Sequence, residues 1–487
     1  MESIHEKYEV TIGLEVHVRL LTDSKLFSNA PNHFASAPNT NVDAVTLAHP
    51  GTLPFLNEKA ILRAIALGMA CQSDIASEVR FERKHYFYPD LPRGYQISQL
   101  HAPVCSGGFI PIDTGTYTKK IRLNRIHLEE DAGKSIHDQD ENYSLIDLNR
   151  AGTPLLEIVT EPDLHHPDEA WHFLYELRKL VRYLDVCDGN MEEGSMRCDA
   201  NISVKRKEDK GMGTKVEVKN LNSLRFLKKA IQSEVFRQIQ LLESGKPVQS
   251  HTRGYHAEKG STFVLRSKEE AEDYRYFPEP DLPPVPITME MKNQVMNSLP
   301  ELPFQLAQRL HAQYALGTTD VMGLTEDKRV ADYFLEIMKY TSEAQVAANW
   351  MLGTVRAWLN QNNVSMESFP IKPRQLAALI DMISRGEVSH SAAVSAVFEE
   401  MIANPAAEPR NIVVKLNLFQ NSDVATIQRY VTQVVESYPE KVKQFHNGKK
   451  GLTTFFMGEI MKASGGKLDP RLTNQILTKT LINKKAI

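Results

Sequence analysis

YEVTIGLEVHVRL, residues 8–20, decides the fold class of the N-terminal region. Every second residue of this stretch is apolar from Val10 to Leu20, and the positions between them are polar or glycine. An alternation with a period of two over this length predicts a strand that has one buried and one polar face. Glu15 and His17 lie two positions apart on the polar face, so their side chains can reach the same space.

The same alternation recurs at residues 197–205 and 214–219. A polar loop that contains glycine joins these two stretches, and this pattern predicts a β-hairpin. Asp199, Glu217 and Lys219 fall on the polar face of the hairpin. We therefore expect the N-terminal region to be built on an antiparallel sheet that carries several charged side chains on its polar face.

Helical patterns interrupt the strands and later replace them. Apolar residues recur at helical spacing in residues 168–184 and 223–243, and the sequence is helical in pattern beyond a group of prolines at 278–286. Proline fixes φ and has no amide donor, so this group predicts an extended linker. A second break, with two prolines, lies at residues 404–410. The expected fold is α+β: a mixed α/β cradle domain with an antiparallel sheet at residues 1–295, then two all-helical domains at 296–405 and 406–487.

The composition is that of an ordinary globular protein of 487 residues, with 42% apolar and 24% charged residues. No run approaches the ~18 apolar residues of a membrane span, so no membrane partner is expected. The four cysteines lie far apart and form no C-x-x-C pair, which is typical of a reducing compartment. Residues 1–8 are charged and do not resemble a secretory signal, so a cytoplasmic location is expected.

The net charge of −4 is unevenly distributed along the chain. Residues 441–487 contain ten basic and two acidic residues, a net charge of +8. Within them, Lys462 and Lys467 flank a glycine pair in front of a capped helix. Lysines and helix N-terminal amides suit phosphate groups, so the tail is expected to bind a polyanion such as a nucleic acid backbone. The alternative is a basic helix surface that is only solvated.

Acidic residues gather in the N-terminal region at Glu15, at Glu129 and Glu130, and at Asp199. Together with His17, these carboxylates can hold Mg²⁺ while nucleotide phosphates complete its coordination. The alternative is a solvated strand face with ordinary ion pairs. Sequence alone leaves open whether the three groups converge.

Lys84 stands in an aromatic stretch, RKHYFYPD at residues 83–90. Such a lysine either occupies a cavity that perturbs its pKa or lies on the surface beside core tyrosines. No acyl-enzyme nucleophile is apparent, because Cys105 lies in a turn-like stretch and no serine-rich amidase segment is present. Residues 132–135 resemble the end of a P-loop, but Leu128 replaces its first glycine, which excludes a Walker-type ATPase.

Nine motifs in one order resemble the B subunits of the glutamyl/aspartyl-tRNA amidotransferases along nearly the whole chain. They are 12–17 (IGLEVH), 50–54 (PGTLP), 86–90 (YFYPD), 94–99 (GYQISQ), 127–134 (HLEEDAGK), 148–163 (LNRAGTPLLEIVTEPD), 191–201 (MEEGSMRCDAN), 218–223 (VKNLNS) and 273–281 (DYRYFPEPD). Residues 457–467 resemble the small helical tail domain of the same family.

The resemblance implies a two-step reaction on mischarged Glu-tRNA(Gln), Asp-tRNA(Asn) or both. The B subunit uses ATP to phosphorylate the side-chain carboxylate of the tRNA-bound amino acid, and ammonia then displaces phosphate to give the amide. The ammonia comes from glutamine hydrolysed in the glutaminase subunit, and a small third subunit joins the other two in a heterotrimer. The missing nucleophile of this chain agrees with that division of labour.

The resemblance also implies roles for single residues. The implied Mg²⁺ ligands are Glu15, His17, Glu129, Glu130 and Asp199. The implied catalytic residues are Glu15, His17, Lys84 and Glu130, with Lys84 where the ammonia path meets the phosphorylation site. Contacts to ATP are expected from Glu217 and Lys219, and contacts to tRNA from Lys462 and Lys467.

One loop departs from the family pattern. Many relatives hold a structural zinc there with four cysteines. The matching positions in this chain are Ser28, Ala30, Asp43 and Thr46. Structural zinc sites need cysteine or histidine, so no structural zinc is expected. Packing of residues such as Phe27, Phe34 and Val42 is expected to hold the loop instead.

Two other classes of function stay open at this point. One is a non-catalytic tRNA-binding scaffold within the complex, and the acidic groups weigh against it. The other is a self-sufficient glutamine amidotransferase, which the missing nucleophile disfavours. A mutation of Glu15 distinguishes the scaffold from an ATP-dependent enzyme, because a scaffold would keep full activity.

Overall fold

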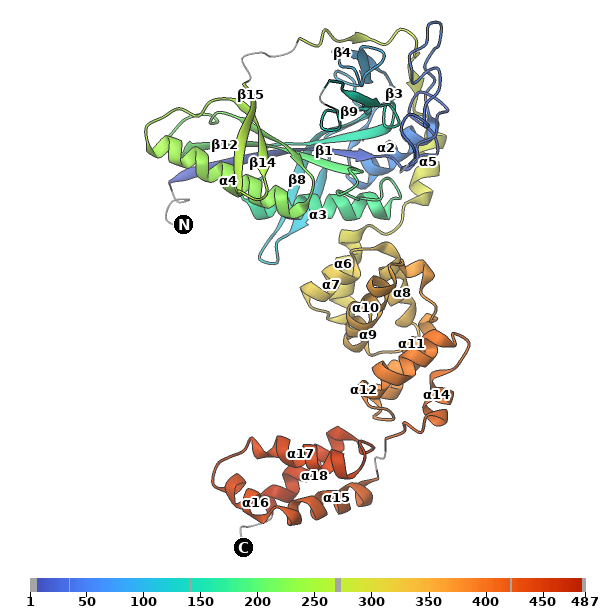
Figure 1. Ribbon diagram of the computed structural model, residues 1–487, viewed down its shortest axis with the longest axis vertical. Coiled ribbons are helices and arrows are strands. Elements are labelled where there is room, and N and C mark those ends of the chain that lie inside the picture. The colour runs from blue at the N-terminus through green and yellow to red at the C-terminus, as the bar shows by residue number, and fades with distance from the viewer. Residues whose placement is uncertain (1–6, 35, 141, 268–272, 421–422, 484–487) are drawn as a thin grey trace. The chain divides into compact units, whose positions relative to one another are not determined.

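The computed structural model describes residues 7–34, 36–140, 142–267, 273–420 and 423–483 (Figure 1). Its chain forms two compact units, Met1–Gln308 and Arg309–Ile487. The first unit combines sheets and helices, and the described part of the second unit is helical. The α+β class with a helical C-terminal region is therefore confirmed, whereas the division at residues 295 and 405 stays a prediction.

The main sheet of the first unit contains ten of the described strands. In sheet order they are β15 (Ser261–Ser267), β14 (His251–His256), β13 (Val216–Leu221), β12 (Met196–Arg206), β1 (Tyr8–Arg19), β11 (Pro154–Thr160), β8 (Thr118–Glu130), β6 (Cys105–Ser106) and β2 (Asp74–Ile75), with β7 (Phe109–Asp113) also paired to β8. All neighbours are antiparallel except β13 and β14, which are parallel. The predicted hairpin is confirmed as β12 and β13.

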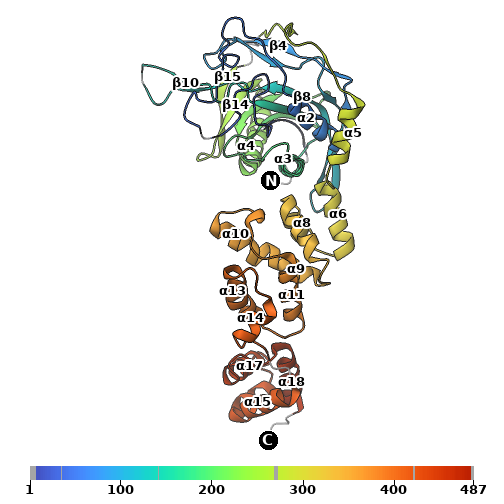
Figure 2. The same ribbon diagram turned by 90° about the vertical axis from the view of Figure 1, so that its right-hand side faces the viewer.

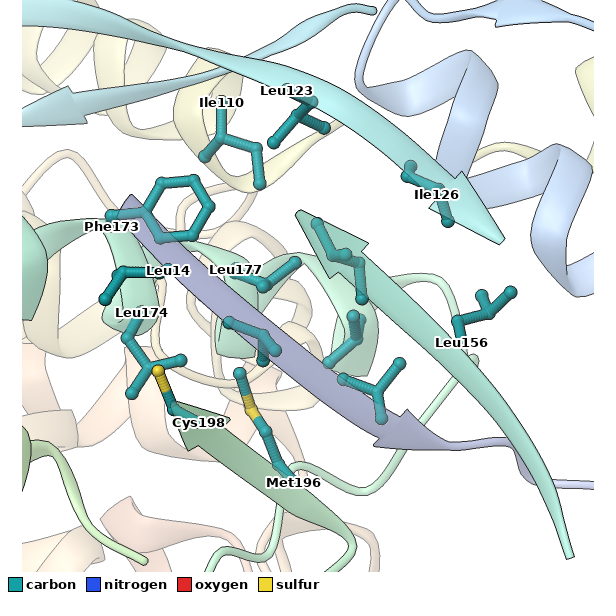
Figure 3. Packing of buried hydrophobic residues seen from close by; sticks show 14 of the residues in the cluster. Leu14, Ile110, Leu123, Ile126, Leu156, Phe173, Leu174, Leu177, Met196 and Cys198 are labelled. Atoms are coloured by element: carbon teal, nitrogen blue, oxygen red, sulfur yellow. The ribbon is translucent and has the colours of Figure 1, made fainter. Parts of the chain in front are cut away.

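β1 runs through the middle of this sheet between β11 and β12. Its side chains alternate between buried and partly exposed from Tyr8 to Arg19, as the sequence predicts. The buried side packs against helices α3 (Pro167–Tyr183) and α4 (Leu224–Glu243), as Figure 3 shows for Leu14 and Phe173. Because one face of the sheet is covered by these helices, the polar side chains of β1 lie on the opposite face.

Three small sheets complete the first unit. They are β16 (Phe277–Pro278), β4 (Glu82–His85) and β5 (Tyr95–Ser98); β10 (Leu145–Asp147) and β9 (Lys134–Ile136); and β17 (Val285–Pro286) and β3 (Glu78–Val79). The proline-rich stretch 278–286 is extended, as expected, but it is not a free linker. β16 and β17 pair with strands of the first unit, and Glu279 is buried in an ion pair with Arg83. Proline tolerates these edge positions because its missing amide is not needed there.

The remaining helices of the first unit are α2 (Glu58–Ala70) and α5 (Met289–Ser298), and α6 (Pro303–Tyr314) crosses the boundary between the units. The second unit contains α7 (Thr318–Leu324), α8 (Lys328–Ile337), α9 (Ala344–Trp350), α10 (Arg356–Asn362), α11 (Pro373–Ser384), α12 (His390–Ala392), α13 (Phe398–Ala403), α14 (Pro409–Lys415), α15 (Val424–Ser437), α16 (Pro439–His446), α17 (Leu452–Ala463) and α18 (Pro470–Asn483). Within the described residues, none of these helices combines the length and apolar character that crossing a membrane requires.

The sequence contains local start signals for three of the C-terminal helices, an aspartate at 423, a proline at 439 and Asp-Pro at 469–470. The Asp423 carboxylate accepts a hydrogen bond from the Thr426 amide at 2.8 Å, which caps α15. Pro439 opens α16, and Asp469 accepts from the Arg471 amide at 2.8 Å in front of α18. Helices α15, α17 and α18 lie side by side (Figure 2), and together with α16 they contribute residues to one buried cluster. Two of the ten basic residues of this region, Lys484 and Lys485, lie outside the described residues.

Candidate functional site

The register of the central strands lines up charged residues on the polar face of the sheet. On β1, His17 lies opposite Glu157 of β11, and Glu157 in turn lies opposite His127 of β8. Two residues earlier, Glu15 lies opposite Asp199 of β12. Residues that are adjacent across antiparallel strands have neighbouring side chains, so this face concentrates carboxylate and imidazole groups.

His17, Glu129 and Glu157 form the tightest group on this face. The His17 Nε2 atom lies 3.2 Å from Glu129 Oε1 and 3.2 Å from Glu157 Oε2. One ligand atom of each residue lies within 4.8 Å of the other two, which is close enough for one metal ion to contact all three. His127 supports the group, since its Nε2 atom is 3.7 Å from both carboxylates.

The charges in this group depend on one another. Burial alone would lower the pKa of His17, but its hydrogen bonds to Glu129 and Glu157 outweigh burial and raise the pKa to about 10. Burial of the two carboxyls is likewise outweighed. Hydrogen bonds from His127 and His17 hold the pKa of Glu129 well below its usual value, and a hydrogen bond from His17 together with the electrostatic effect of His127 lowers the pKa of Glu157. At neutral pH, an imidazolium therefore lies between two carboxylates.

The donor set of this group fits a divalent cation. One imidazole nitrogen and two carboxylate oxygens are ligands that Mg²⁺ or Mn²⁺ accepts, provided that water or phosphate oxygens complete the coordination. A cation would take the place of the His17 proton as the charge that compensates Glu129 and Glu157. Glu157, which the sequence-based ligand set omits, completes this group.

Glu130 points away from this group, although it is adjacent to Glu129. Alternate residues of a strand face opposite sides, and Glu130 shares the core side of β8 with Leu128. There it forms a buried ion pair with Arg93 and accepts a hydrogen bond from the Ile97 amide at 3.0 Å. Burial raises the pKa of Glu130. The structure thus gives Glu129 and Glu130 separate surroundings, whereas the sequence pattern treated them as a pair.

Glu15 and Asp199 lie beside the His17 group and belong to a second set of contacts. Asn201 Nδ2 donates to Glu15 Oε1 at 2.8 Å. The Lys219 ammonium lies 3.4 Å from Asp199 Oδ2 and 3.2 Å from Glu217 Oε1. Burial would lower the pKa of Lys219, but these two carboxylates outweigh it and raise the pKa. The predicted residues of β12 and β13 are therefore brought together on the same sheet face as Glu15.

Aromatic side chains border the acidic face. Lys84 Nζ lies 4.7 Å from the centre of the Tyr274 ring and 5.8 Å from that of Tyr86. Burial raises the pKa of Tyr86 and of Tyr276, and the nearby Glu129 carboxylate reinforces both shifts. Lys84 thus lies among tyrosines, rather than in an isolated surface position.

The loop at residues 28–46 is held partly by hydrogen bonds. Ser28 Oγ and Thr46 Oγ1 lie 3.2 Å apart, and Asp43 accepts from the Thr46 amide at 2.8 Å. Phe27 is buried, as expected, but Phe34 is exposed and packs against the Arg19 guanidinium, 3.7 Å from the ring centre. Hydroxyl and carboxylate contacts therefore add to the packing that the sequence predicts.

The two lysines expected to contact nucleic acid are both exposed. Lys462 lies in the last turn of α17, and Lys467 follows the glycine pair in front of α18. The structure keeps them in the tail region, whereas His17 and its neighbours lie in the first unit.

The fold and the site define a class: an α+β domain with an acidic, histidine-containing sheet face, joined to a helical unit. The family model described as the GatB/GatE catalytic domain matches residues 10–293, and the one described as the GatB domain matches residues 332–481. The chain therefore belongs to the family of amidotransferase B subunits, as its motifs suggest.

Similar curated proteins cover almost the whole chain. Each of the three that follow is named as the B subunit of an aspartyl/glutamyl-tRNA(Asn/Gln) amidotransferase. The protein of Thermosynechococcus vestitus is 43% identical over 97% of this chain and 96% of its own length. That of Thermodesulfovibrio yellowstonii is 44% identical over 98% of this chain and 99% of its own length. That of Trichlorobacter lovleyi is 45% identical, with 98% and 99% covered.

Proposed function

We propose that this chain activates the side-chain carboxylate of tRNA-bound glutamate, aspartate or both with ATP and then converts it to the amide. A carboxylate oxygen attacks the γ-phosphorus of ATP, the bond to the β-phosphate oxygen breaks and ADP leaves. Ammonia then attacks the carbonyl carbon of the acyl phosphate, and inorganic phosphate leaves. The observation that carries this proposal is the His17, Glu129 and Glu157 group on the polar face of the sheet.

The residues around that group have distinct roles in this proposal. His17, Glu129 and Glu157 would hold Mg²⁺, which, when bound, offsets the negative charge of the transferring phosphoryl group. Lys219 contacts phosphate oxygens, and Asp199 and Glu217 orient its ammonium group. Glu15 lies on β1 two residues before His17 and extends the acidic face.

The remaining proposed roles are those of the Glu130–Arg93 ion pair, of Lys84 and of the partner subunits. Glu130 fixes the position of Arg93, and Lys84 lies where ammonia reaches the carboxylate. A glutaminase subunit supplies the ammonia, and a small third subunit joins the heterotrimer, which works in the cytoplasm. The loop at residues 28–46 binds no structural zinc, because its matching positions offer no thiolate.

Glu15→Ala separates catalysis from a scaffold role. In the assembled complex, the variant should lose ATP-dependent amidation about 100-fold, because it removes a carboxylate beside the phosphoryl-transfer site. Glutamine hydrolysis, measured in the same samples, should remain detectable. Amidation at the wild-type rate would instead favour a non-catalytic tRNA-binding subunit.

Binding of Mg²⁺ should release a proton from His17. The residue is charged at pH 7 because its pKa is raised to about 10, whereas a metal ligand must be the neutral imidazole. Metal affinity should therefore rise with pH below that value, by up to roughly tenfold per unit. Calorimetric titration with MgCl₂ in buffers of different ionisation enthalpy should show a release of about one proton at pH 7. His17→Asn should abolish the release, and a heat that does not depend on the buffer would contradict the assignment.

The basic tail should bind the tRNA body. Lysines that neutralise phosphates release counterions, so tRNA affinity should fall as salt rises. Deletion of residues 406–487 should raise the KM for tRNA and flatten this salt dependence, and it should leave ATP binding and glutamine hydrolysis intact. The double variant Lys462→Ala, Lys467→Ala should lower the slope of log affinity against log salt by about 1 to 2.

Lys339→Ala is a suitable control for the tail variants. Lys339 lies outside residues 406–487, is exposed and pairs with Glu336 at 2.5 Å, so its removal should leave the slope unchanged. An unchanged affinity and slope in the tail-deleted complex would show that the tail does not bind tRNA.

A further inference from the structure

An exposed aromatic residue stands at the border of the acidic face. Phe87 is 86% exposed and Tyr88 is 54% exposed, and they are the next two residues after Tyr86. The Tyr86 ring packs edge-on against Tyr88 and Tyr274, with ring centres 5.9 Å and 6.2 Å apart. Strand β4, which ends directly before Tyr86, pairs with β5. Gln96 of β5 donates to the Glu130 carbonyl at 2.6 Å and Ser98 donates to Glu129 Oε2 at 3.4 Å, so the exposed pair follows a ribbon that is bonded to the acidic strand end.

The position of Phe87 is fixed by its own loop. Gly94 has a φ of +69°, and a Cβ atom at this position would lie 3.1 Å from ring atoms of Phe87. The ring therefore lies directly against the glycine backbone. The loop is closed by hydrogen bonds from the Leu91 amide to the Tyr88 carbonyl at 3.0 Å and from the Gly94 amide to the Leu91 carbonyl at 2.9 Å. An anchored loop thus presents an apolar ring to solvent.

A cationic side chain lies on the adjoining segment. The His85 amide donates to the Tyr274 carbonyl at 3.0 Å, which joins the segment of Phe87 to that of Arg275. The Arg275 side chain is 82% exposed, and its Nε atom lies 3.6 Å from the Asp273 carboxylate, an ion pair open to solvent that a phosphate can replace. Exposed aromatic rings beside an arginine are found on surfaces that bind single-stranded nucleic acid, where bases stack and phosphates pair with arginine.

We propose that Phe87 stacks on a base in the single-stranded 3′ end of the aminoacyl-tRNA. This inference rests on the proposed function, because that function brings the aminoacyl end of the tRNA to the acidic face. Stacking next to Tyr86 would hold the terminal nucleotide while its amino acid reaches the His17 group. Phe87 is then a positioning residue and takes no part in bond breaking.

The test replaces the aromatic face but keeps the apolar bulk. In the assembled complex, Phe87→Leu should raise the KM for aminoacyl-tRNA about tenfold, the loss typical of one stacked base. The KM for ATP and the rate at saturating tRNA should stay unchanged. Phe87→Trp should restore the wild-type KM, since it restores a stacking face. Phe236→Leu on α4 is the matched control, because Phe236 is 50% exposed on another element.

A binding measurement separates this inference from the proposed reaction. A tRNA with 2-aminopurine in place of its 3′-terminal adenine should lose fluorescence on binding the wild type and Phe87→Trp but not Phe87→Leu. The readout needs no chemistry, so it holds even if amidation fails. Equal quenching in all three proteins would overturn the inference. Quenching of 2-aminopurine riboside triphosphate, but not of the tRNA, would overturn the inference and indicate that Phe87 binds ATP. Failure of the Phe87→Leu chain to assemble into the complex would overturn it and indicate that Phe87 binds a partner protein.

Discussion

Glu129→Gln is expected to lower ATP-dependent amidation by about 1000-fold, which corresponds to roughly 4 kcal/mol of barrier. The substitution keeps the shape of the side chain and removes the charge that lies 3.2 Å from His17 Nε2. Without this charge, Glu157 remains the only carboxylate of the group beside the imidazole, and a divalent cation loses one ligand. The His17 pKa, which the two carboxylates raise to about 10, should fall toward its usual value.

The measurement compares amidation and glutamine hydrolysis in the same assembled complex. Hydrolysis should persist, because the proposed function assigns it to the glutaminase subunit. Glu157→Gln should behave like Glu129→Gln, whereas Glu9→Gln should retain wild-type activity. Glu9 is an exposed carboxylate on the same strand as His17 and pairs with Lys205 at 3.3 Å. Equal activity of Glu129→Gln and Glu9→Gln would contradict the assignment of the site.

Glu234→Ala is expected to destabilise the first unit by about 3 to 5 kcal/mol. The residue is 0% exposed in α4 and accepts hydrogen bonds from Arg237 at 2.6 and 2.9 Å, from Gln238 at 2.9 Å and from Thr262 at 2.8 Å. Arg253 Nε lies 3.3 Å away. Removal of the carboxylate leaves two guanidinium groups without their shared counter-charge, and this loss exceeds the loss of packing alone.

Hydrogen exchange detects this change locally, which matters because a protein of several units does not unfold in one step. Amides of α4 and β15 should exchange faster in Glu234→Ala, since Glu234 joins these elements through Thr262. Gln240→Ala, an exposed substitution on the same helix, should leave exchange unchanged. A difference of less than about 1 kcal/mol between the two variants would show that the buried carboxylate is not a major contributor.

Sequence periodicity predicts the central sheet because only one face of its strands is packed against the core. The alternation of residues 8–20 gives both the strand and the face on which Glu15 and His17 lie, and the structure confirms it. The helix starts at Asp423 and Asp469 can also be predicted from nearby residues, because each side chain caps an amide only two or three residues away. By contrast, the proline-rich stretch 278–286 pairs with strands about 200 residues earlier, and no local rule predicts such pairing.

The residues of the candidate site differ in how far the sequence alone places them. The alternation of side chains along β8 already separates Glu129 from Glu130. Leu128 and Glu130 lie on one face of the strand, and Glu129 lies on the other. Glu157 interrupts an apolar strand, PLLEIVT, and a charge in such a strand signals a buried partner. Its partner could not be named from the sequence, because the register between β11 and β1 depends on the tertiary fold.

Transfer of oxygen from the substrate carboxylate to phosphate tests the central claim most directly. The assembled enzyme is supplied with ATP, glutamine and a tRNA charged with glutamate or aspartate whose side-chain carboxylate carries ¹⁸O at both oxygens. If the carboxylate attacks the γ-phosphorus, the released phosphate should contain one ¹⁸O atom for each amide formed, and Glu129→Gln should form neither product at an appreciable rate. Amide formation with no ¹⁸O in the phosphate would contradict carboxylate phosphorylation at this site.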